Sequence, residues 1–168
     1  MLRAALLFLL FVPQDLSRVE EFGLRVAKDF KVTLVSDHTL ANDIYSMTLD
    51  TKGRIVVSSQ GWIKTLHDDD GDGKADRAVL LAEIKSGAMG MCFDGNDLLF
   101  SGDGGFWRYR DADGDGKADG PPENLGKFAS GEHGHHAMRK GPDGFWYLIG
   151  GNDTGFGKQH VQLPDSPV

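Results

Sequence analysis

The fold prediction begins with two nearly identical nine-residue segments, Asp68-Asp-Asp-Gly-Asp-Gly-Lys-Ala-Asp76 and Asp111-Ala-Asp-Gly-Asp-Gly-Lys-Ala-Asp119. They lie 43 positions apart, and each follows a short strand-like run that contains aromatic residues. Carboxylates recur at positions 1, 3, 5 and 9, and glycine stands at position 6, where the chain must turn sharply. Oxygen ligands at this spacing are those that Ca²⁺ prefers. The two segments therefore predict two calcium loops and a structural repeat.

The predicted calcium ligands are the four carboxylates of each loop and the main-chain carbonyl of the lysine at position 7. They are Asp68, Asp70, Asp72, Lys74 and Asp76 in the first loop, and Asp111, Asp113, Asp115, Lys117 and Asp119 in the second. An EF-hand is excluded, because position 12 is Val79 or Pro122 instead of the bidentate Glu. The pattern resembles the calcium loops on β-hairpins of integrin-type propellers. The alternative is two acidic turns without metal, since Asp and Gly favour turns for conformational reasons alone.

The rest of the chain repeats with nearly the same period. Met47, Met91 and Met138 recur at intervals of 44 and 47 positions, and each precedes a glycine turn and a second strand-like stretch. Those stretches span residues 54–58, 97–101 and 145–149. A period of about 40–50 residues is typical of four-stranded propeller blades. We therefore predict an all-β chain that forms a partial β-propeller, with about three four-stranded blades near residues 41–86, 87–130 and 131–168.

The length limits how much of a propeller the chain supplies. Residues 41–168 give 128 positions, which is room for three blades, whereas closed propellers have typically four to eight. We expect residues 20–168 to be the N-terminal portion of a larger, six-bladed propeller. An open stack exposes its strand edges, so the remaining blades or a second copy are the predicted partners.

Composition agrees with short strands and tight turns and excludes one class of partner. The chain has 23 glycines in 168 residues, about twice the average usage. Its formal net charge is −7, and no cluster of lysine or arginine interrupts the acidity. Nucleic acid is therefore not an expected partner.

The N-terminus predicts export. Arg3 precedes nine apolar residues, 4–12, which suit the core of a signal peptide and are too short to span a membrane. Residues 1–19 are thus a candidate signal peptide, although no small-x-small cleavage site follows. The predicted location is periplasmic or extracellular, with membrane association as an alternative. A short buried segment or a misplaced start codon is the alternative. Residues 20–37 then predict one lead-in strand, because apolar residues roughly alternate there.

A histidine cluster is the candidate centre for chemistry. His133, His135 and His136 fall within four positions, directly before a predicted strand. A loop that enters an inner propeller strand opens on the central channel, where a neutral imidazole can take a proton from a hydroxyl. Asn152 and Asp153 end the same predicted hairpin and are further candidates for this site. The alternatives are a transition ion shared by His133 and His135, or histidines that only fill the channel.

Four motifs carry a resemblance to a known family. They are residues 45–50 (Tyr-Ser-Met-Thr-Leu-Asp), 61–68 (Gly-Trp-Ile-Lys-Thr-Leu-His-Asp), 86–95 (Ser-Gly-Ala-Met-Gly-Met-Cys-Phe-Asp-Gly) and 131–144 (Gly-Glu-His-Gly-His-His-Ala-Met-Arg-Lys-Gly-Pro-Asp-Gly). Residues 21–156 resemble the first half of the propeller of planctomycete-type membrane-bound dehydrogenases. Those resemble in turn the glucose/sorbosone dehydrogenases, which are six-bladed quinoproteins.

The resemblance implies a sugar or alcohol dehydrogenase that uses pyrroloquinoline quinone and, in a full-length parent, a haem electron acceptor. It places the catalytic base at His133, with His135, His136, Asn152 and Asp153 at the cofactor. Glu132 stands where the family has Asn, and His136 stands where the sugar dehydrogenases prefer Gly. No Cys-x-x-Cys-His haem site occurs in this chain. We therefore expect this chain to be inactive alone. The alternative is a non-catalytic, calcium-stabilised propeller that binds a glycan or a protein.

Overall fold

The computed structural model describes residues 15–130, 134–151 and 154–155. The chain divides into two compact units, Met1–Leu34 and Val35–Val168. Strands and turns make up the described part, which contains no α-helix and only one short 3₁₀ turn. The prediction of an all-β chain is confirmed.

The first unit contains a small hairpin. Strands β1 (Leu16–Val19) and β2 (Leu24–Ala27) pair antiparallel, and the 3₁₀ turn η1 (Glu20–Phe22) joins them. Gly23 ends the turn with φ of 64°, a left-handed conformation that glycine adopts without steric cost. The prediction of one lead-in strand over residues 20–37 is wrong, because the chain reverses here and no strand follows β2 before residue 46.

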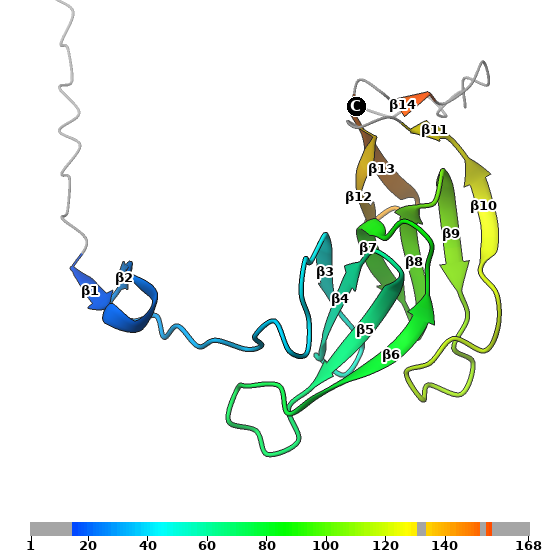
Figure 1. Cartoon of the computed structure of the whole chain (residues 1–168). Coiled ribbons are helices and arrows are strands. Elements are labelled where there is room, and N and C mark those ends of the chain that lie inside the picture. The colour runs from blue at the N-terminus through cyan, green and yellow to red at the C-terminus, as the bar shows by residue number, and fades with distance from the viewer. Residues whose placement is uncertain (1–14, 131–133, 152–153, 156–168) are drawn as a thin grey trace, which may run out of the picture. The chain divides into compact units, whose positions relative to one another are not determined.

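The second unit begins with two four-stranded antiparallel sheets, each built from consecutive strands (Figure 1). The first sheet consists of β3 (Ser46–Leu49), β4 (Ile55–Ser59), β5 (Trp62–His67) and β6 (Arg77–Glu83). The second sheet consists of β7 (Ala88–Asp94), β8 (Asp97–Gly102), β9 (Gly105–Tyr109) and β10 (Glu123–Lys127). Neither sheet closes on itself.

Two-stranded pairs follow. The third sheet consists of β12 (His135–Lys140) and β13 (Trp146–Gly150), and β11 (Ala129–Ser130) pairs with β14 (Thr154–Gly155). The first two sheets lie inside the predicted repeats 41–86 and 87–130, and the third lies inside 131–168.

The three sheets share one register in their first hairpin. Met47 pairs with Val57, Met91 with Phe100, and Met138 with Leu148. The sequence repeat is therefore also a repeat of strand pairing. The connecting turns contain Gly53, Gly95 and Gly144, which all have positive φ and match the predicted hairpin signals.

The first strands of successive sheets lie beside one another. Ser46 Oγ donates to the Ala88 carbonyl at 2.7 Å, and the Ala88 amide donates to Ser58 Oγ at 2.8 Å. Between the second and third sheets, Arg139 Nη1 of β12 donates to the Met91 carbonyl of β7 at 3.1 Å. A Cβ at Gly90 would lie 2.5 Å from the His136 carbonyl oxygen, so only glycine permits this approach.

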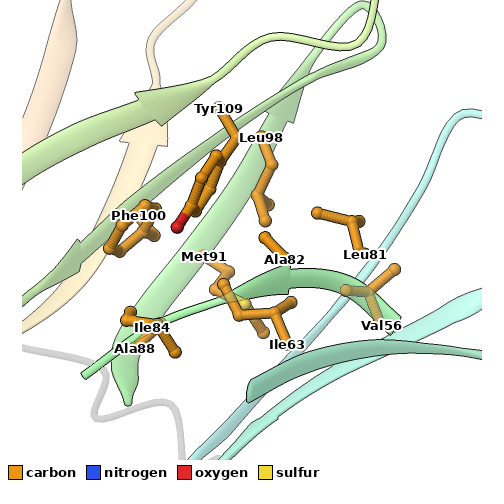
Figure 2. Packing of buried hydrophobic residues seen from close by; sticks show 10 residues of the cluster. All are labelled: Val56, Ile63, Leu81, Ala82, Ile84, Ala88, Met91, Leu98, Phe100 and Tyr109. Atoms are coloured by element: carbon orange, nitrogen blue, oxygen red, sulfur yellow. The ribbon is translucent and has the colours of Figure 1, made fainter. Parts of the chain in front are cut away.

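The main core lies between the first and second sheets. Its buried residues come from β4, β5 and the β6 region of the first sheet and from the first three strands of the second (Figure 2). They are Val56, Ile63, Leu81, Ala82, Ile84, Ala88, Met91, Leu98, Phe100 and Tyr109. Because side chains alternate along a strand, β4 and β8 also present a second face. On β4 that face carries Val57, which packs with Ala41 and Leu66 in a smaller cluster.

Candidate metal loops and histidine cavity

The two acidic loops occupy the same place in the first and second sheets. Residues 68–76 join β5 to β6, and residues 111–119 lie in the connection from β9 to β10. Each therefore links the third strand of its sheet to the fourth. Each also closes in the same way, since Asp76 donates its amide to the His67 carbonyl and Asp119 donates to Arg110 at the matching position.

The carboxylate at position 1 organises each loop. Asp68 accepts the amides of Gly71 and Gly73 at 2.7 and 2.9 Å. Asp111 accepts the amides of Gly114 and Gly116 at 2.8 and 3.0 Å. All four glycines have positive φ, which lets the backbone turn its amides inward.

The remaining carboxylates make matching bonds in the two copies. Position 3 accepts the amide of position 5, position 5 accepts the amide of position 7, and position 9 accepts the amide of position 2. The acceptors are Asp70, Asp72 and Asp76 in the first loop, and Asp113, Asp115 and Asp119 in the second. The carboxylates of the predicted ligand set thus share one scaffold. The lysines at position 7, Lys74 and Lys117, donate their backbone amides to it, and the ligand role of their carbonyls stays a prediction.

The loops gather negative charge in a small volume. Carboxylate oxygens of Asp68, Asp70 and Asp76 all lie within 4.8 Å of one another. In the second loop, Asp111, Asp113 and Asp115 meet the same limit. Like charges at this distance repel, and a cation among them relieves the repulsion. The candidate metal ligands are all oxygen atoms, a set that suits Ca²⁺ better than a transition metal.

The residue at position 2 is not part of the predicted ligand set, although it is acidic in the first loop. Asp69 forms a salt bridge with Arg77 at 2.7 Å, and the hydrogen bond from Arg77 lowers the pKa of this carboxyl. Ala112 takes the same position in the second loop. Asp69 is therefore an acidic residue of the first loop that points its charge at an arginine, and it serves below as a matched control.

Each loop also donates a backbone hydrogen bond to a segment that precedes its own sheet in the chain. The sequence analysis did not predict these bonds. The amide of Ala118, at position 8, donates to the Leu81 carbonyl of β6 at 2.9 Å. The amide of Ala75, at position 8 of the first loop, donates to the Val35 carbonyl at 2.7 Å. Lys52 Nζ adds a bond to the Gly114 carbonyl at 3.1 Å. The only trace of these bonds in the sequence is the alanine that recurs at position 8 of both loops.

His135 lies at the start of β12 and is buried, with 3 % of its surface exposed. Neither ring nitrogen has a hydrogen-bond partner in the described part of the chain. This residue lines a cavity of about 320 Å³ together with Lys85, Asp103 and five other residues. These five are Ser86, Gly87, Met89, Gly102 and Gly104. Both ring nitrogens are themselves buried, so a ligand in the cavity reaches them only if the neighbouring atoms move.

Of the other members of the predicted centre, the structure describes only His136. His136 is exposed, and its backbone packs on Gly90. His133, the predicted base, and Asn152 and Asp153, the predicted cofactor contacts, lie outside the described residues. Their roles stay predictions.

Comparison with known proteins gives one match. The model of the domain of unknown function DUF7133 matches residues 22–165. The chain belongs to the DUF7133 family. No curated protein and no solved structure matches it. The DUF7133 match covers both acidic loops and the histidine cluster, so these features lie within the family domain. Within the described residues, no helix of this DUF7133 chain is long and apolar enough to cross a membrane.

Burial of His135 predicts a pH-dependent stability. Desolvation lowers the pKa of this imidazole below its ordinary value of about 6.5. The unfolded chain then binds more protons than the folded chain in mildly acidic solution. The stabilisation is complete above about pH 6.5 and is lost as the pH falls through the folded pKa. We expect His135→Gln to flatten the fall in the urea midpoint between neutral and mildly acidic pH, whereas exposed His136→Gln leaves it unchanged. Equal slopes in the two variants would contradict the assignment.

Proposed function

We propose that this chain is a calcium-binding module of propeller type, in which one Ca²⁺ fixes the outer hairpin of each four-stranded sheet. The observation that carries the proposal is the set of five hydrogen bonds between carboxylates and backbone amides that the two loops share. One scaffold of inward-turned amides holds the carboxylates at positions 1, 3, 5 and 9 in both copies. Each loop also brings three carboxylates within 4.8 Å of one another, where they repel unless a cation lies among them.

The propeller assignment is supported by the repeat of sheets. Each sheet places its first strand beside the first strand of its neighbour, and the calcium loop joins the third strand to the fourth. This order of strands is that of a propeller blade. Extracellular calcium is concentrated enough to fill weak sites, which agrees with the proposed export of the chain.

A quinoprotein-like dehydrogenase propeller is the second candidate, and the cavity at His135 favours it. Burial lowers the pKa of this imidazole, and neither ring nitrogen has a hydrogen-bond partner among the described residues. Bound pyrroloquinoline quinone would supply the oxidising power, and His133 would take the substrate hydroxyl proton. Dye reduction by the chain with the quinone and an aldose would favour this function.

Isothermal titration with Ca²⁺ tests the first proposal. We expect two ions to bind per chain, and one after Asp70→Asn or Asp113→Asn. These substitutions remove one charge while an amide oxygen remains to accept the backbone bond that each carboxylate accepts. Asp69→Asn is the matched control, because it removes the same charge from the first loop at a residue paired with Arg77. Absence of binding heat, or equal loss in the control, would refute the proposal.

A further inference from the structure

The two acidic loops share one internal scaffold but differ in what surrounds them. At position 4 of the first loop, Gly71 faces open space, whereas a Cβ added to the equivalent Gly114 would lie 2.8 Å from Asn96 Nδ2. At position 1, Asp68 is exposed and Asp111 is half-buried. A cavity of about 260 Å³ adjoins the first loop, but the space that adjoins the second holds only about 10 Å³. The second loop is therefore packed against other parts of the chain, and the first is largely open.

The turn between β3 and β4 of the first sheet supplies part of this packing. Lys52 Nζ, on that turn, donates to the Gly114 carbonyl at 3.1 Å. Arg54, at the end of the turn, approaches the same loop, because a Cβ added to Gly116 would lie 3.1 Å from its Nη2. The first sheet thus reaches across to hold a loop that belongs to the second sheet.

Asp50 fixes the shape of this turn. Its carboxylate accepts the amides of Lys52 and Arg54, each at 2.9 Å, and also pairs with Arg54 Nε at 2.6 Å. The Asp50 side chain is only 7 % exposed, so salt screens this ion pair weakly. The base of the turn is therefore rigid, and Lys52 extends from it to the second loop.

On the basis of the calcium-binding function proposed above, we infer that Lys52 is a positioning residue for Ca²⁺ at the second loop, which binds the ion more tightly than the first. Gly114 stands outside the predicted ligand set, so the ammonium and the ion do not compete for one oxygen. A loop that is already held in its binding shape loses less conformational entropy when the ion binds. By linkage, Ca²⁺ strengthens the contact between this loop and the first sheet by the same factor.

The charge of Lys52 acts in the opposite direction to its positioning role. An ammonium close to the loop repels a second cation, so repulsion alone predicts that removing Lys52 tightens calcium binding. Loss of positioning predicts that the same change weakens it. The sign of the change in affinity therefore separates the two effects.

Isothermal titration of the full chain with Ca²⁺ tests the inference in single-site variants. Asp70→Asn leaves the second loop intact and Asp113→Asn leaves the first, so we expect the lower Kd in the Asp70→Asn chain. Adding Lys52→Met should lower the affinity of the second loop by about fivefold, the lower end of the range for linked sites, and leave the first loop unchanged. Lys52→Arg should restore most of the affinity, because a guanidinium also donates to a carbonyl.

Lys127→Met is the control for net charge. Lys127 is exposed on β10, so this variant removes the same charge and should leave the affinity of both loops unchanged. Near-UV circular dichroism checks that each variant is folded, as expected since Lys52 is also exposed.

The outcomes separate this inference from the calcium-binding function itself. Equal affinity at the two loops would overturn the inference and leave the calcium-binding function in place. An unchanged or tighter second site after Lys52→Met, or an equal loss at both loops, would do the same. Absence of binding heat in both single-site chains would overturn the calcium-binding function and the role of Lys52 together.

Discussion

Removal of calcium with EGTA is expected to lower the thermal unfolding midpoint of the chain. A ligand that binds only the folded state stabilises it by about 2.7 kcal/mol when its concentration is one hundred times its dissociation constant. Two independent loops would double this value. One kcal/mol shifts the midpoint of a chain of this size by roughly 2–4 °C. Differential scanning calorimetry in Ca²⁺ and in EGTA measures the difference.

Variants assign the shift to the loops. With Asp70→Asn and Asp113→Asn combined, we expect the midpoint in Ca²⁺ to approach that in EGTA. Asp69→Asn keeps four carboxylates at the ligand positions and should retain the calcium response. A calcium response that persists in the double variant would show that Ca²⁺ acts elsewhere on the chain.

Phe100→Ala is expected to cause the largest loss of stability from a single core substitution. Phe100 is fully buried between the first two sheets, and its ring stacks on Tyr109 with the centroids 5.4 Å apart. Tyr109 in turn donates its hydroxyl proton to the Glu83 carbonyl of the first sheet. Truncating a buried phenylalanine costs about 3–5 kcal/mol, because the lost contacts leave a cavity. Urea unfolding followed by tryptophan fluorescence measures this loss.

An exposed phenylalanine supplies the comparison. Phe30 is 72 % exposed, so Phe30→Ala should change the free energy of unfolding by no more than about 0.5 kcal/mol. If Phe100→Ala were equally mild, the packing between the first two sheets would not stabilise the chain in the way described.

The local features of the fold were predictable because short-range chemistry fixes them. Short continuous apolar runs define β4, β8 and β13, and a glycine with positive φ lies in the turn before each of these strands. Each acidic loop follows a strand, as its place after a strand-like run predicts, and its Asp and Gly pattern favours a turn without help from distant residues.

Other features depended on contacts that no local pattern reveals. Residues 20–37 alternate like a strand, yet Gly23 turns them back into a hairpin. The docking of Ala118 on Leu81 joins residues of different sheets and leaves only a recurring alanine in the sequence. The burial of His135 could not be read from the sequence either, because Lys85 and Asp103, which line the same cavity, lie far from it along the chain.

The sequence by itself determined the all-β class, the period of the repeat, the hairpin turns and the two acidic loops. Each of these follows from the conformational preference and charge of residues a few positions apart. The tertiary structure decided which faces are covered, that Met91 and Met138 are buried whereas Met47 is exposed, and that His135 lines a cavity. Burial is a property of the neighbours that a side chain meets, and equivalent residues meet different neighbours at the middle and at the ends of a stack.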